Sequence, residues 1–269
     1  NTQRKALYAR FSQAISLMPS LNGYGTIKEE SSSGADDAVD TAAETFVTAG
    51  LSKVLKINNI CDSEHLADCG VPDKVIKVGG SVAFTEFPKT LYSYNGTFSD
   101  RGKYPNPDTK AAAFETVNGE SIVVFYNPRC TQGTYRWGAY NCTQVQMCAN
   151  FVYDLNGKKG PNTVGKDIGF ITALYPSDPV VVAPMPIRAI STGWGVTADK
   201  ISSVCKKVDA DSRVPNIEEL KSLYYNKTLV NLEGIWHWSS TKVDANNLYT
   251  LQMDGPIEIR GGTVTNGVT

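Results

Sequence analysis

The sequence lacks an excess of charge of either sign. Its 269 residues contain 26 Lys and Arg against 27 Asp and Glu, which gives a formal net charge of −1. The basic residues are scattered, and no basic stripe with interleaved aromatic residues is present. Nucleic acids and acidic membrane surfaces attract proteins through such concentrations of positive charge. The sequence therefore predicts neither a nucleic acid nor a membrane surface as a partner of the folded chain.

Residues that commonly carry out catalysis or bind zinc are also scarce. His65 and His237 are the only histidines, and no two cysteines are spaced as CxxC, so a zinc site lacks its usual ligands. No nucleophile elbow, phosphate-binding loop or dinucleotide fingerprint occurs in the chain. A glycosidase that uses two carboxylates has no pair that the sequence identifies. We therefore expect a protein that is not an enzyme.

Long apolar runs are absent as well. No segment approaches the roughly 20 apolar residues that span a bilayer, and no secretory signal is recognisable. A helical pattern begins almost at once, which is typical of a processed form or of a chain that lacks an upstream segment. With 41% hydrophobic and 20% charged residues, the chain is expected to be globular and to form one large domain or two.

Six cysteines are present, an even number. Without a zinc motif, this count favours three disulfides and an exported protein, because disulfides persist in oxidising compartments. Many pairings are compatible with six cysteines, and the sequence alone does not select one. Our expectation is one local pair and two further pairs, namely Cys61–Cys69, Cys130–Cys142 and Cys148–Cys205.

Helical periodicity marks two segments near the start of the chain. Residues 3–18 place apolar side chains on one face and are expected to end at Pro19 and Gly23. Residues 36–49 form a second predicted helix that Gly50 ends, and residues 51–57 continue as a short helix. The inward faces are expected to contain Leu7, Phe11, Ala14, Ile15 and Met18 in the first helix and Val39, Ala43, Phe46 and Val47 in the second.

Strand patterns dominate the middle of the chain. Residues 111–127 predict a hairpin, because Asn118 and Gly119 form a turn between two apolar runs. Further strands are expected over residues 148–153, 168–175 and 180–184. The sequence thus predicts an α+β fold.

The densest group of turn residues lies at 154–167, inside the run FVYDLNGKKGPNTVGKD that starts at Phe151. Asp, Asn and Gly at this density indicate left-handed backbone and side-chain-to-backbone hydrogen bonds. Their oxygens are also hard donors that suit Ca²⁺, although no Glu occupies the twelfth position of an EF-hand loop. Two interpretations stay open: a pair of hydrogen-bonded turns, or a calcium site formed by Asp154, Asn156, Asn162 and Asp167.

Three segments resemble bacterial type IV pilin-like proteins. They are the opening helix, the stretch from Phe46 to the cysteine-bounded loop 61–69, and residues 148–167 with their Asp-x-Asn-Gly, Gly-Pro-Asn and Gly-Lys-Asp turns. The resemblance implies an N-terminal spine helix, here without its membrane half, packed on an antiparallel sheet in a domain over residues 1–185. It also implies that the spine helix joins subunits into a filament, with packing residues Leu7, Phe11, Ile15 and Met18.

Residues 197–241 form a second recognisable block. Asn216 followed by Glu219 is a capping-box pattern for a helix start. Residues 234–241 read as a strand with Trp236 and Trp238 on one face. The order Arg-hydrophobe-Pro, Glu-Leu and Trp-Ser-Ser-Thr resembles a bacterial C-type-lectin-like module over residues 190–255, without the Val-Arg-Cys strand that usually ends that family.

The lectin-like resemblance implies an α+β region over residues 186–269 whose ligands meet the loops after the tryptophan strand. Trp236 and Trp238 either form a stacking platform for a sugar or pack in the core, and the alternation favours core packing for at least one of them. The polar loop after the strand either contacts a partner or is simply solvated. The residues predicted to bind a ligand are Trp236, Lys242, Asp244, Asn246, Asn247 and Tyr249.

The resemblances together imply an exported, non-enzymatic subunit of an extracellular type IV pilus on a bacterium. It would be a minor or tip subunit that contacts other pilin subunits through its N-terminal helix. A different part of the chain would bind a surface glycan or a protein receptor. Contact with a membrane is expected only through the missing N-terminal segment, which anchors such subunits in the inner membrane before assembly. The alternatives are a pseudopilin of a type II secretion system and a secreted carbohydrate-binding protein. Calcium is the only cofactor considered.

Overall fold

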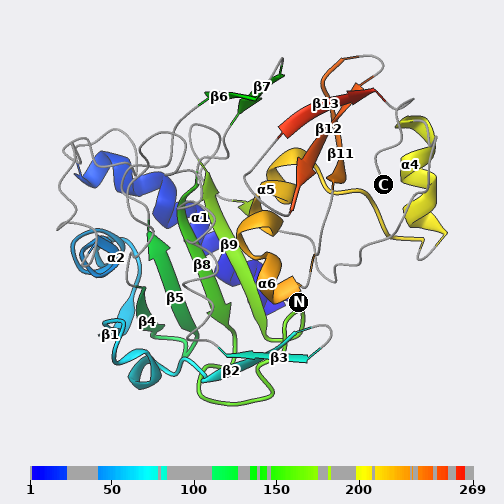
Figure 1. Cartoon of the computed structure of the whole chain (residues 1–269). Helices are drawn as coiled ribbons and strands as arrows, with labels where there is room; N and C mark the ends of the chain where they lie inside the picture. The colour runs from blue at the N-terminus through cyan, green and yellow to red at the C-terminus, as the bar shows by residue number, and fades with distance from the viewer. Residues whose placement is uncertain are drawn as a thin grey trace. The chain divides into compact units, whose positions relative to one another are not determined.

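The computed structural model describes residues 2–22, 42–77, 80–83, 111–126, 134–137, 140–143, 147–174, 181–182, 198–207, 210–230, 232, 236–244, 247–253 and 259–263. The chain is α+β and divides into two compact units (Figure 1). Unit 1 contains Asn1–Gln132, Gln146–Val182 and Thr228–Asn231. Unit 2 contains Gly133–Val145, Ala183–Lys227 and Leu232–Thr269. The expected domains at 1–185 and 186–269 stay a prediction.

Unit 1 is built on a six-stranded sheet in the order β1-β4-β5-β8-β9-β10, in which every neighbouring pair is antiparallel. The predicted hairpin turn is confirmed, with Gly119 at a φ of 84° between β4 and β5. The strands predicted over residues 148–153 and 168–175 are confirmed over their described residues, and of the strand predicted over 180–184 only Val181 and Val182 are described, as β10. The strands are β1 (Ile57–Cys61), β4 (Ala112–Thr116), β5 (Ser121–Tyr126), β8 (Met147–Asp154), β9 (Ile168–Leu174) and β10 (Val181–Val182), and a separate pair is formed by β2 (Lys74–Lys77) and β3 (Gly80–Ala83).

Both faces of this sheet are covered. Strands β5 and β9 are buried along their whole length, which explains why their sequences are continuous apolar runs rather than alternating ones. Phe114, Ile122 and Phe151 lie in the core cluster that also contains the helical residues near the N-terminus. The alternate residues of the same strands, such as Val123 and Val152, are equally buried on the other face.

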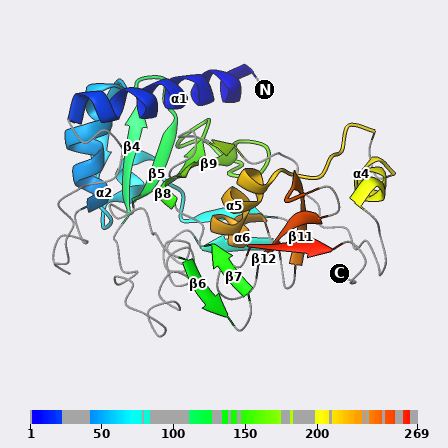
Figure 2. The ribbon, with the colours of Figure 1, turned by 90° about the horizontal axis from the view of Figure 1, so that it is seen from above.

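Helix α1 (Thr2–Asn22) crosses one face of the sheet (Figures 1 and 2). Leu7, Phe11, Ile15 and Met18 have at most 1% of their surface exposed and belong to the same core cluster as the sheet. The ring of Phe11 lies 6.2 Å from that of Phe114 and 5.1 Å from that of Phe151, measured between centroids. The apolar stripe at helical spacing therefore fixes α1 to the sheet by burial.

The prediction that Pro19 ends the first helix is wrong, because α1 continues to Asn22. A proline inside a helix removes one backbone hydrogen bond and crowds the carbonyl four residues earlier. Here it lies within the last turn, where only a few residues follow it.

The second helical segment is irregular. Helix α2 (Ala42–Thr45) is followed by a π-helical turn over Phe46–Gly50 and a 3₁₀ turn over Leu51–Lys53. The predicted helix over residues 36–49 is helical wherever it is described, although its last turn, up to Gly50, is π-helical. The short helix predicted over residues 51–57 is confirmed only as far as Lys53, since β1 begins at Ile57 to pair with β4. In this arrangement the Phe46 ring stacks on Tyr126 at 4.1 Å. Residues 36–41, with Val39, lie outside the described residues.

Unit 2 contains a three-stranded antiparallel sheet, β11-β12-β13. The predicted capping box is confirmed: Asn216 Oδ1 accepts a hydrogen bond from Glu219 N, and Glu219 Oε2 accepts one from Asn216 N, both at 2.8 Å. The elements are β6 (Thr134–Trp137), β7 (Tyr140–Thr143), α4 (Ala198–Lys206), α5 (Ile217–Tyr225), β11 (Trp236–Lys242), β12 (Asn247–Gln252) and β13 (Ile259–Thr263), while α6 (Lys227–Val230) begins at the end of this unit and continues in unit 1.

The cysteines are described only in part. Cys61 and Cys69 form a disulfide that closes the loop after β1, as the local pairing predicted. Cys205 has a free thiol, so the expected Cys148–Cys205 disulfide is not formed in this structure. These two residues belong to different units. Cys130 and the side chains of Cys142 and Cys148 lie outside the described part of the chain.

Candidate functional site

The segment from Asp154 to Asp167, which we call the β8–β9 loop, forms two successive turns. Asp154 Oδ1 accepts a hydrogen bond from Asn156 N at 3.1 Å, and Asn156 Nδ2 donates to Gly160 O at 3.1 Å. The carboxylate of Asp167 accepts from Asn162 N at 2.7 Å and from Thr163 N at 2.6 Å. The side chains expected from the sequence thus do shape this loop, as turn residues do when they bond nearby backbone groups.

Two glycines allow the chain to pass close to the start of β5. Gly157 has a φ of 57°, and a Cβ added there would lie 2.4 Å from Gly119 O. Gly70 has a φ of 79°, and a Cβ there would lie 2.5 Å from Ser121 Oγ. A side chain at either position would combine left-handed backbone with a steric clash. Glycine therefore brings the disulfide loop and the β8–β9 loop together around Ser121.

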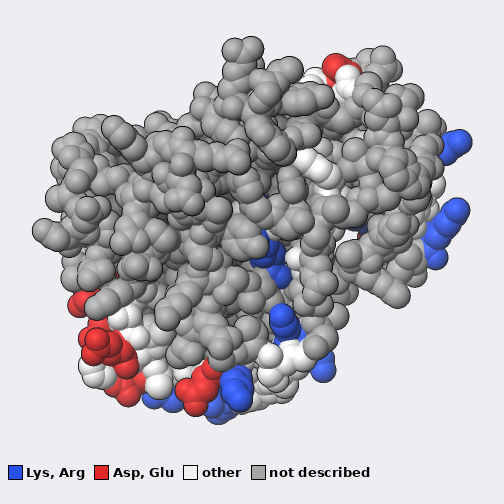
Figure 3. Space-filling view, viewed as in Figure 1, with Lys and Arg blue, Asp and Glu red and all other residues white. Residues whose placement is uncertain are grey.

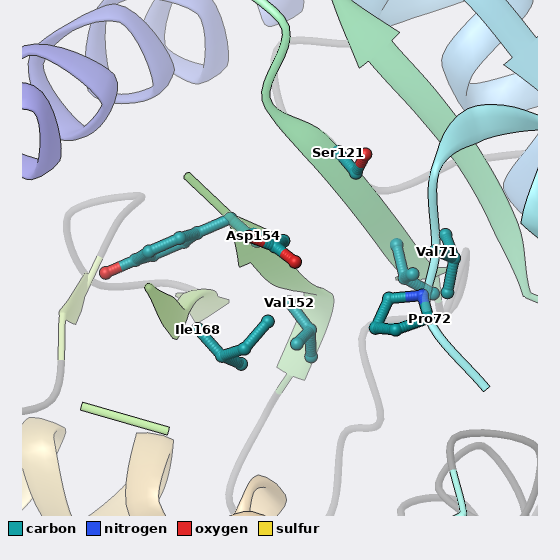
Figure 4. Close-up of a pocket in the computed structure, with 8 residues that line it drawn as sticks. Val71, Pro72, Ser121, Val152, Asp154 and Ile168 are labelled. Atoms are coloured by element: carbon teal, nitrogen blue, oxygen red, sulfur yellow. The ribbon is translucent and has the colours of Figure 1, made fainter. Parts of the chain in front are cut away.

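Asp154 is the most unusual residue of this region. It pairs with Ser121 across β5 and β8, and only 3% of its surface is exposed. Asp154 Oδ2 and Ser121 Oγ are both buried without a hydrogen-bond partner among the described residues. They line a cavity of about 10 Å³ together with Val71, Pro72 and Ile168 (Figure 4), which is room for about one water molecule.

Burial raises the pKa of Asp154 to about 6, and the nearby negative charge of Asp167 acts in the same direction. The ordinary value is 3.8. At a pH between these two pKa values, Asp154 is protonated in the folded chain and has lost its proton in the unfolded chain. Asp154 therefore opposes folding increasingly as the pH rises above 3.8, and the full effect is reached above its folded pKa of about 6.

We predict that Asp154 makes the chelator-treated protein less stable as the pH rises. The free energy of unfolding should fall by up to about 3 kcal/mol between pH 4 and pH 6 on account of this group, and should then level off. In Asp154→Asn this contribution disappears, and the variant should be the more stable protein at pH 7. Urea denaturation from pH 3.5 to pH 8 measures both effects, with exposed Asp68→Asn as control. Parallel pH profiles for wild type and Asp154→Asn would contradict the prediction.

The β8–β9 loop also holds the first turn of α1. Gln3 Nε2 donates to Leu155 O at 2.8 Å. Arg4 Nη2 donates to Gly165 O at 3.2 Å and to Lys166 O at 2.9 Å. The position of these carbonyls, and so the conformation of the loop, determines how the start of α1 is attached.

A second cluster on α1 was not predicted. Arg10 Nη2 lies 2.5 Å from Glu120 Oε1, and Glu120 is only 1% exposed. The other carboxylate oxygen, Oε2, accepts a hydrogen bond from the hydroxyl of Thr116. A sequence pattern does not reveal this pair, because its members are 110 residues apart and the two charges look like ordinary surface residues.

The disulfide loop carries exposed carboxylates. Asp62, Glu64 and Asp68 are exposed, and Figure 3 shows acidic side chains gathered at the lower left of the view with basic side chains beside them. Asp62 Oδ1 lies 2.8 Å from His65 Nδ1. This contact raises the pKa of His65 and lowers the pKa of Asp62. Both side chains are open to solvent, so this contact has the features of an ordinary ion pair on a solvated surface.

The predicted ligand-binding residues of unit 2 lie in and beside the β11–β12 hairpin. Lys242 and Asp244 are exposed, while Trp236, Asn247 and Tyr249 are partly buried. Asn247 Nδ2 donates to Asp244 Oδ2 at 2.6 Å, and Val243 N donates to Asn247 O at 2.9 Å. Asp244 and Asn247 therefore form the hairpin turn itself. Asn246 lies outside the described residues.

The two tryptophans have different surroundings. Trp238 packs against a small core cluster of Ile201, Val214 and Leu248, so this ring serves packing. Trp236 is partly buried and pairs with Gln252 across β11 and β12. Of the two, only Trp236 stays a candidate for contact with a ligand.

No group of three or more His, Cys, Asp or Glu side chains is arranged to hold a metal ion within the described part of the chain. No described helix combines the length and apolar character needed to cross a bilayer.

Comparisons with protein-family models, curated proteins and solved structures gave no match for this chain.

Proposed function

We propose that this chain is the folded head of an exported, non-enzymatic subunit of a type IV pilus-like filament, in a minor or tip position. The observation that carries the proposal is the packing of α1. A helix that begins at Thr2 lies across an antiparallel sheet with its apolar stripe buried. This is the arrangement that the resemblance to pilins implies for a spine helix.

Contacts between subunits are then expected on the side of α1 that faces away from the sheet. Leu7, Phe11, Ile15 and Met18 are at most 1% exposed, so within one subunit they attach the helix to its own sheet. Tyr8 and Leu17 are 38% and 46% exposed. They are nine residues apart and therefore lie on opposite flanks of α1, so they are proposed as two separate points of contact between copies.

The hairpin of unit 2 is the proposed place of contact with a surface glycan or protein receptor. Trp236 and Tyr249 each offer partly exposed aromatic surface, and aromatic residues suit such contacts. Trp236 pairs with Gln252 and Lys242 with Leu248, at opposite ends of β11, so the two aromatic residues are proposed as separate points of contact. This part of the proposal predicts that a Trp236→Ala variant loses adhesion while filaments still assemble.

The gene sequence upstream of Asn1 tests the filament proposal. A Gly-Phe or Gly-Met processing site followed by about 20 apolar residues would support it. A cleavable secretory signal that ends in small residues would overturn it and leave a secreted carbohydrate-binding protein as the better proposal. Antibody labelling of intact cells then separates the remaining alternatives, because a pilus reaches the surface and a pseudopilus of a type II secretion system does not.

A further inference from the structure

Three oxygens of the β8–β9 loop lack hydrogen-bond partners among the described residues although they are buried. They are Asp154 Oδ2, Asn156 Oδ1 and Asn162 Oδ1. All three are acceptors, and buried acceptors without a partner destabilise a fold unless something supplies the missing interaction. A group of acceptors without a donor is the arrangement that a cation satisfies.

The same loop holds two carboxylates without a neutralising cation. The structure shows no ion pair for Asp154 or Asp167 within its described part. Leu155 N donates to Asp167 O at 3.0 Å, which joins the two ends of the loop. Asp154 is only 3% exposed, so its unpartnered oxygen lies inside the protein at the start of the loop.

We propose that the β8–β9 loop binds a divalent cation, calcium by its donor chemistry, through Asp154, Asn156, Asn162 and Asp167. Two carboxylates and two carboxamides supply hard oxygens, and water completes the six to eight positions that Ca²⁺ takes. The irregular turns suit calcium better than Mg²⁺, which demands near-ideal octahedral geometry. Lys158 occupies the fifth position from Asp154, so the site differs from an EF-hand loop.

Cation binding would also affect α1. The loop presents the carbonyls of Leu155, Gly165 and Lys166 to Gln3 and Arg4. A cation that orders the loop should therefore slow hydrogen exchange in the first turn of α1. This inference does not depend on the filament proposal, and either can fail without the other.

Titration of chelator-treated protein with CaCl₂ and, separately, with MgCl₂ tests the site by calorimetry and melting temperature. We expect one calcium bound per chain, weaker binding of magnesium and a rise in melting temperature with calcium. The absence of heat together with an unchanged melting temperature in chelator would overturn the proposal. In that case the cavity beside Asp154 holds water only. Magnesium binding as tight as calcium would overturn the choice of cation.

Variants separate this site from adventitious binding to surface carboxylates. Asp154→Asn should lose roughly tenfold or more in calcium affinity, while its melting temperature in chelator rises because the buried charge is gone. Asn162→Ala should also weaken calcium binding. Asp68→Asn removes an exposed carboxylate of the disulfide loop and should leave the titration unchanged. Equal calcium affinity in wild type and Asp154→Asn, or an equal loss in Asp68→Asn, would overturn the assignment.

Discussion

Replacing Phe11 with Ala is expected to lower the free energy of unfolding by about 3–5 kcal/mol. Phe11 is 1% exposed, and its ring contacts those of Phe114 and Phe151. Truncation removes the burial of the ring and leaves a cavity between α1 and two central strands, which cannot close without moving the helix. Urea denaturation followed by circular dichroism measures the loss.

Tyr8→Ala provides the matched control for Phe11→Ala, because Tyr8 lies on the same helix with 38% of its surface exposed. Both substitutions remove an aromatic ring and introduce the same good helix former. Tyr8→Ala should change stability by no more than about 0.5–1 kcal/mol. Similar losses in the two variants would contradict the packing of α1 by the stripe that contains Phe11. A selective loss of filament assembly in Tyr8→Ala would support the proposed subunit contacts.

The parts of the fold that the sequence predicted correctly are those governed by local patterns. Apolar spacing predicted which side of α1 is buried, and Asn118-Gly119 predicted the β4–β5 hairpin. The capping box at Asn216 follows from residues three apart. Each of these signals depends on neighbours along the chain, so a single sequence is enough to detect it.

The parts that the sequence did not predict depend on residues distant along the chain. In the π-helical turn, the ring of Phe46 stacks on that of Tyr126. Tyr126 lies 80 positions further along the chain. Ser121 was not singled out, because its importance comes from its cross-strand neighbour Asp154. The four residues proposed for calcium were found from composition alone, yet only the structure shows that three of them carry buried oxygens without partners.

The second large effect is expected at Arg10, whose removal leaves a buried carboxylate without its cation. Arg10→Met keeps most of the apolar stem and should cost about 3 kcal/mol, the lower end of the range for breaking a buried ion pair. The lower end applies because the Arg10 side chain is 33% exposed while that of Glu120 is 1% exposed. The hydroxyl of Thr116 still donates to Glu120 but brings no charge. Urea denaturation at pH 7 measures the effect, with Lys5→Met as a control at an exposed position of α1.

A double-mutant cycle with Glu120→Gln separates the ion pair from packing. In the Arg10→Met background, Glu120→Gln removes the uncompensated charge, so the double variant should be more stable than Arg10→Met alone. In the wild-type background the same substitution should destabilise the protein, because Arg10 loses its carboxylate partner. The opposite signs follow only if the charge of Glu120 is buried and neutralised by Arg10. Additive losses in the double variant would show that Arg10 and Glu120 stabilise the protein independently and not as an ion pair.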